Sequence, residues 1–165
     1  IAVLSTAQMV AIATDDMAAF TTAQIRSLSG AQFGALTSEQ LVALTTEQMG
    51  ALASTQVMAL TTDQVVAIAT EDIAALQTAQ VRYLSSSQVE ALTTDQVAAF
   101  ETQDIGSLST TALRGLTTDG VQALTTDQIA ALTTTQIVSL STTQIAAIQT
   151  DEVEAFKAWL HARQA

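Results

Sequence analysis

The 165-residue sequence contains no cysteine, no proline and no asparagine, and it has one histidine and one tryptophan. Without cysteine the chain can form neither a disulfide nor a thiolate centre. A single histidine, His161, cannot build a histidine-based metal cluster or a proton relay. The many Ser and Thr hydroxyls therefore have no general base to activate them. We expect no enzymatic activity, no cofactor and no metal centre.

Positive charge is also scarce, and long apolar runs are missing. Five Lys and Arg residues stand against sixteen Asp and Glu residues, which gives a formal net charge of -11. A chain of this charge repels the phosphates of nucleic acids, so we expect no nucleic-acid partner. No segment approaches the roughly twenty apolar residues that a membrane-spanning helix needs. We therefore expect no membrane span.

The sequence consists instead of one octapeptide repeated without insertion or deletion. Leu, Ile or Phe recurs at every eighth residue from Leu4 to Phe156. If this residue is position 0, position +5 is always apolar, and position +7 is Ala, Ser or Gly except at Tyr83. Position +6 varies freely, as in Arg26 and Glu90, and is expected to face water. Arrays of so short a unit fold by stacking neighbouring units, which predicts a repeat solenoid.

The eight-residue period excludes one straight helix. An α-helix advances about 100° per residue, so eight residues rotate each Leu by roughly 80° relative to the last. A period of four residues per turn is also too far from 3.6 for a supercoil to absorb. Thr61 with Gln64 shows the spacing of a capping box, and Leu60 with Val65 shows that of a hydrophobic staple. Each unit should therefore begin a short helix near +1 and end it near +7.

Two alternatives remain open. Where position +1 is neither Ser nor Thr, the hydroxyl at +2 is the better N-cap, which leaves the helix start ambiguous by one residue. These +1 residues are Ala13, Ala53, Ala69, Gln77, Glu101 and Gln149. A β-solenoid competes because Thr and Val favour strands, but its corners want Gly, Asn and Pro. We predict an all-α solenoid of about twenty eight-residue units, each with one short helix and a tight corner.

The last residues depart from the repeat. We divide the chain into an octapeptide-repeat solenoid over residues 1–156 and a C-terminal capping or junction helix over residues 150–165. Phe156 and Leu160 share an apolar face of that helix, and Trp159 offers an anchor for a second subunit. Phe156, Trp159 and Leu160 are the candidate assembly contacts. A solenoid must cover its last exposed core, so capping is the first interpretation.

A longer period is superimposed on the octads. Residues 1–56 and 57–112 match at nearly half of their positions. Fifty-six residues are seven octads, so a superhelix of about 3.5 units per turn would return matching residues to the same environment. Ile1 already occupies position +5 of a preceding unit, which suggests a fragment of a longer array. Gly30 and Gly34 indicate a slack unit rather than a phosphate-binding loop.

Most of the carboxylates occupy one part of the repeat. Thirteen of the sixteen lie at +3 or +4, the first helical turn, where they complement the positive end of the helix dipole. Calcium binding is the alternative for the paired acids, but no Asp-x-Asp-x-Asp-Gly loop is present. The pairs are Asp15–Asp16, Glu71–Asp72 and Asp151–Glu152.

Residues 123–134 read Ala-Leu-Thr-Thr-Asp-Gln-Ile-Ala-Ala-Leu-Thr-Thr. They resemble the Leu-Thr-Thr-x-Gln-Val/Ile-x-Ala arrays of very large bacterial surface or secreted proteins, often labelled adhesin-like, haemagglutinin-like or haem-utilisation proteins. The resemblance covers nearly the whole chain and implies an extracellular or cell-surface stalk or filament component that self-associates. A haem role lacks support, because His161 is the sole imidazole.

The alternative function is a binding module. Its Ser and Thr rows at +1 and +2 would present a flat polar face to a glycan, a peptide or ice. A binding face should be uninterrupted, whereas six non-hydroxyl residues interrupt the +1 row. The sequence therefore favours the structural role.

Overall fold

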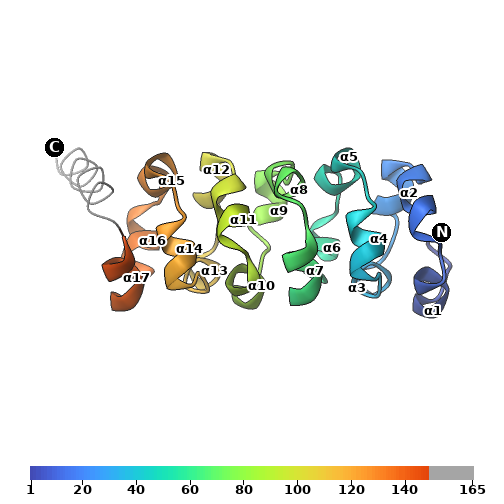
Figure 1. The fold of residues 1–165 in the computed structure, drawn as a ribbon, viewed down its shortest axis with the longest axis horizontal. Helices are drawn as coiled ribbons and strands as arrows, with labels where there is room; N and C mark the ends of the chain where they lie inside the picture. Colours follow the sequence, from blue (N-terminus) through green and yellow to red (C-terminus); the bar gives the residue numbers. More distant parts are fainter. Residues whose placement is uncertain (149–165) are drawn as a thin grey trace.

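The computed structural model describes residues 1–148, and over that range it consists of short helices joined by tight turns. Figure 1 shows the helices stacked in one elongated row, with α1 near one end and α17 near the other. Each octad contributes one helix, which confirms the predicted all-α repeat solenoid. None of the helices in this range is long and apolar enough to cross a membrane. The predicted C-terminal helix over residues 150–165, with Phe156, Trp159 and Leu160, lies outside the described residues.

The helices have the following bounds. They are α1 (Thr6–Val10), the 3-10 helix η1 (Thr14–Ala19), α2 (Thr22–Arg26), α3 (Gly30–Gly34), α4 (Ser38–Val42), α5 (Thr46–Gly50), α6 (Ser54–Val57), α7 (Thr62–Ala67), α8 (Thr70–Ala74), α9 (Thr78–Val81), α10 (Ser86–Ala91), α11 (Thr94–Ala99), α12 (Thr102–Ile105), α13 (Thr110–Leu113), α14 (Thr118–Gln122), α15 (Thr126–Ala131), α16 (Thr134–Ser139) and α17 (Thr142–Ala147).

Each typical helix begins with the predicted capping box. In α7 the N-cap is Thr61, whose backbone is extended and whose Oγ1 accepts a hydrogen bond from the Gln64 N–H at 3.2 Å. In return the Thr61 N–H donates to Gln64 Oε1 at 2.8 Å. Two of the amide groups left free at the helix start are thereby satisfied. This exchange defines where the helix begins within each octad.

Position +1 is the N-cap even where it lacks a hydroxyl. Ala13, Ala53, Ala69, Gln77 and Glu101 all have the extended N-cap conformation and make no side-chain capping bond. The alternative in which the +2 hydroxyl becomes the cap in these units is therefore wrong. A start delayed by one residue would rotate the helix by about 100° and turn the +5 side chain away from the core. Packing, not the capping residue, fixes the start.

The core is a continuous thread of the side chains at 0 and +5. Phe33, Val57 and Leu113, all at +5, are completely buried, and Leu132 at position 0 is 1% exposed. All of the buried apolar side chains form one cluster that runs the length of the described array. Helices of four to six residues are unstable alone, so each octad depends on burial against its neighbours.

The contacts that build this core connect octads about one superhelical turn apart. Helix α10 packs on α7 and on α13, and α8 packs on α5 and on α11. Side-chain hydrogen bonds join residues 28 positions apart, as between Gln64 and Leu36. The packed helices lie three octads apart, and a separation of 28 residues is three and a half octads, which is compatible with the predicted superhelix of about 3.5 units per turn.

Five of the glycines, Gly30, Gly34, Gly50, Gly106 and Gly115, occupy close contacts with the backbone of another unit. A Cβ atom at Gly34 would lie 2.6 Å from the Ala59 carbonyl oxygen, and one at Gly30 would lie 2.8 Å from that of Thr55. The interpretation of this unit as slack is therefore wrong, because α3 packs tightly on the unit of α6. A Cβ atom at Gly50, which is at position +6, would lie 2.9 Å from the Ala75 carbonyl oxygen. Position +6 is thus not uniformly free to face water.

Candidate functional site

The glutamine at position +4 is buried, and its amide group connects two helices. Gln96 is 2% exposed, and its Oε1 accepts a hydrogen bond from the Thr93 N–H at 2.9 Å. Its Nε2 donates to the carbonyl oxygens of Val65 at 2.8 Å and Ile68 at 2.7 Å. These carbonyls belong to the end of α7, one superhelical turn earlier. One amide therefore satisfies the start of its own helix and the end of another.

The same arrangement recurs along the array and forms what we call the glutamine ladder. In each case Nε2 donates to carbonyls 28, 30 or 31 residues earlier, which have few partners because the last carbonyls of a helix lack intrahelical donors. Its other members are Gln32, Gln40, Gln48, Gln56, Gln64, Gln80, Gln88, Gln128, Gln136 and Gln144. The sequence predicted the capping half of this interaction and missed the bridging half.

The first turn of the ladder has free donors. Gln8 and Gln24 are exposed, and each Oε1 closes its own capping box, but within residues 1–148 neither Nε2 has an acceptor. A bridge needs carbonyl oxygens one turn earlier, and the described residues contain none for these two glutamines.

Two buried aspartates occupy the ladder position without being able to bridge. Asp72 is 8% exposed, and its Oδ1 has no hydrogen-bond partner in the described part of the chain. Asp104 is 1% exposed and accepts a hydrogen bond from Thr78 Oγ1 at 2.6 Å. Burial raises the pKa of both carboxyl groups, although a threonine hydroxyl, that of Thr46 or Thr78, partly opposes the rise. An ionised carboxylate cannot donate to a carbonyl, so both units lose the bridge.

Two consecutive units have no polar side chain at +4. Ala112 and Gly120 take the position, and each backbone N–H still donates to its N-cap hydroxyl, at 3.0 Å in both cases. The N-cap amide and the carbonyls one turn earlier receive nothing from these side chains. The ladder is therefore broken over α13 and α14.

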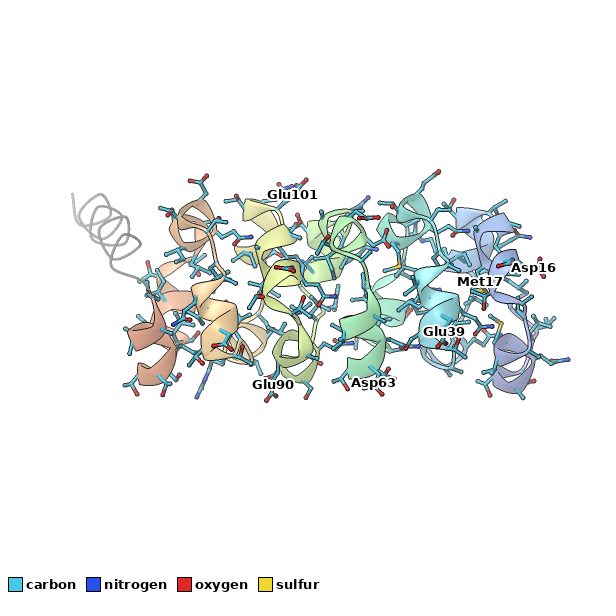
Figure 2. The ribbon with its side chains drawn as sticks, viewed as in Figure 1. Asp16, Met17, Glu39, Asp63, Glu90 and Glu101 are labelled. Atoms are coloured by element: carbon cyan, nitrogen blue, oxygen red, sulfur yellow. The ribbon has the colours of Figure 1, made fainter. Side chains whose placement is uncertain are left out.

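The remaining carboxylates lie on the outside of the array. Figure 2 shows Glu101, Glu90 and Asp63 at its outer edges. At Glu39, in the first turn of α4, hydrogen bonds from the backbone and from Thr37 hold the pKa below its usual range. Residues 1–148 contain no group of three or more His, Cys, Asp or Glu side chains placed to hold a metal ion. Glu39 and Asp63 lie in the first turn of their helices, as predicted, whereas Glu90 lies near the end of α10.

Comparison with known proteins identifies the repeat. The family model described as the ALTTAQ repeat matches residues 9–46, 65–101, 97–134 and 129–158, which together make up more than half of the chain. No curated protein and no solved structure matches the sequence. The match establishes a repeat array and leaves the adhesin-like label unsupported. The chain belongs to the ALTTAQ repeat family.

Proposed function

We propose that the chain is a structural segment of an extracellular bacterial filament, stalk or adhesin, and that copies associate end to end. The observation that carries the proposal is the glutamine ladder, since every turn of the solenoid is a template for the next. Two copies stacked end to end would bring the Nε2 groups of Gln8 and Gln24 near carbonyl oxygens of the kind that accept ladder bonds within the array. A second copy stacked on this turn would continue the pattern.

The chemistry of the array supports a mechanical role. Over residues 1–148 the core is one continuous thread, so each turn transmits an axial load to the next. The role needs no catalytic group. The location outside the cell is supported by the resemblance of the repeat to surface-protein arrays.

The test is assembly of the full chain at high concentration, followed by sedimentation and electron microscopy. The variant Gln8→Glu/Gln24→Glu keeps both capping acceptors, because Glu also closes a capping box, but removes both amide donors. We expect thin fibres from the original chain and monomers from the variant. Gln122→Glu is the matched control, because Gln122 is exposed and lies outside the ladder. Fibres that persist in the double variant, or their absence from the original chain, would contradict the proposal.

Deletion of residues 157–165 tests the proposed contribution of Trp159 and Leu160. If this segment joins subunits, the truncated chain stays monomeric. If it caps the array, truncation increases self-association, as in other uncapped solenoids. A monomer both before and after deletion counts against the filament and favours the spacer or binding-module alternatives.

A further inference from the structure

An open groove of about 810 Å³ crosses the side of the solenoid. It is lined by residues of α2, α5 and α9 and by the N-terminal part of the α6 unit. Helix α2 packs on α5, and α6 packs on α9, so the groove spans units from successive turns. Its volume is in the range of small-molecule sites.

Departures from the repeat gather in this groove. Tyr83 lines it and is the one large residue at +7, a position that is otherwise Ala, Ser or Gly. Gln77 and Ala53 also line it, and both replace the Ser or Thr that the other units favour at +1. Arg26 adds one of the chain's five basic residues. The solenoid does not need these residues, because most units fold with the standard ones.

The groove presents an aromatic ring among unpaired polar groups. Tyr83 is 46% exposed, and the Arg82 guanidinium lies 5.7 Å from the centre of its ring. The side chains of Arg26 and Glu47 carry opposite charges, and neither makes a hydrogen bond or an ion pair with another residue in the range 1–148. The hydroxyls of Thr22 and Ser54 complete a wall of donors and acceptors.

Charge and polarity narrow the class of ligand. A net charge of -11 repels anions, and the groove itself has one basic and one acidic side chain, Arg26 and Glu47, so it attracts neither an anion nor a cation strongly. The walls contain Leu52 and several alanines but no broad aliphatic surface, which argues against a lipid or another apolar ligand. The ligand that fits these walls is a neutral molecule with hydroxyl groups on its rim and C–H groups on its faces.

We propose that this groove binds a short neutral oligosaccharide. The Tyr83 ring packs against the C–H face of one sugar ring, because amphipathic aromatic side chains combine an apolar face with a polar edge. Arg26 and Glu47 hydrogen-bond to neighbouring sugar hydroxyls, and the Gln77 amide orients the next ring. The site is separate from the ladder, so it gives a structural array the ability to recognise a glycan along its side.

The test is NMR titration of the full chain with cellobiose, maltose, lactose and N,N′-diacetylchitobiose. We expect at least one sugar to shift amide signals of α5 and α9 at millimolar concentration, and Tyr83→Ala to weaken that binding about tenfold. Gln77→Thr should weaken it as well. Both variants install a residue that is found at the same repeat position elsewhere, so the fold is retained and a loss of binding reports on the groove.

Arg114→Ala, an exposed change that lies outside the groove, is the matched control and should bind as the original chain does. The blocked neutral peptide acetyl-Ala-Ala-Ala-Ala-amide should cause no shift. The proposal is overturned if none of the four sugars binds, if Tyr83→Ala binds equally well, or if the peptide occupies the groove instead.

Discussion

The glutamine ladder can be tested by removing its donor and nothing else. In Gln96→Glu the side chain keeps its length and an oxygen for the Thr93 N–H, but it loses the NH2 group that reaches Val65 and Ile68. Gln24→Glu is the matched control, because Gln24 makes the same capping contact and its Nε2 has no acceptor among residues 1–148. The pair differs in whether the donor is used and in burial, because Gln96 is 2% exposed and Gln24 is exposed.

The expected magnitude follows from the lost bonds. Each neutral hydrogen bond contributes about 0.5–1.5 kcal/mol net, and an unpaired buried acceptor costs about 1–3 kcal/mol. Since Gln96 makes two such bonds while 2% exposed, Gln96→Glu should lose about 3 kcal/mol or more at neutral pH. Gln24→Glu should change the free energy of unfolding by less than about 0.5 kcal/mol.

The pH dependence of the stability loss distinguishes the loss of the hydrogen-bond donor from a change in side-chain size. The buried carboxyl group that Gln96→Glu introduces has a raised pKa in the folded state, so its protonated form is favoured at low pH and can donate one O–H bond to a carbonyl. The deficit should therefore be largest at pH 7 and should shrink as the pH falls towards about 4.3, the ordinary value for Glu. Urea unfolding and hydrogen exchange of the α7 amides would measure it at each pH. Equal losses for the two variants, or a deficit that does not vary with pH, would refute the bridging role.

Three further predictions follow from burial and from the gaps in the ladder. Asp72→Gln should restore the bridge and stabilise the protein by about 1–3 kcal/mol at pH 7. Because the folded-state pKa of Asp72 is raised above 3.8, this gain in stability should fall as the pH drops through that raised pKa. A gain that stayed constant in urea unfolding from pH 7 to 4 would contradict the prediction. Hydrogen exchange should be faster in residues 108–123, where +4 is Ala or Gly, than in residues 84–99, where Gln88 and Gln96 both bridge, and equal protection would show that the Gln column does not matter. Leu92→Asp should lower the melting temperature strongly, since Leu92 is 7% exposed, whereas exposed Arg82→Asp should hardly change it; comparable shifts by circular dichroism would argue against the assigned core.

The sequence could predict most of what happens inside one octad. The period of eight requires a break, and the spacing of Thr61 to Gln64 locates it, because a capping box involves only neighbours in sequence. The apolar columns at 0 and +5 likewise predict the buried thread. Where the prediction for a single octad failed, as at Ala53 and Glu101, the local preference for a capping hydroxyl was weaker than core packing. Local sequence preferences therefore predict the repeat unit, and core packing determines where its helix begins.

The interactions between turns could not be read from the octad alone. Gly30 and Gly34 have no local reason to be glycine, and their role becomes apparent only when the backbone of α6 is placed beside them. The groove is a similar case. Arg26 and Tyr83 belong to units seven octads apart in the sequence, and they line the same groove only because the superhelix brings those units together. A period of 56 residues suggested the pitch but not which atoms face each other across a turn.

One feature of the sequence indicates the bridging role of glutamine. A capping box accepts Glu as readily as Gln, and Glu would also suit the helix dipole. Among residues 1–148 the +4 position nevertheless contains no Glu, while Glu occurs freely one residue earlier, as at Glu39, Glu47 and Glu71. A preference for the amide where the carboxylate serves the helix start equally well implies a second demand on the side chain. That demand is for a donor, and the carbonyls one turn earlier are where it is used.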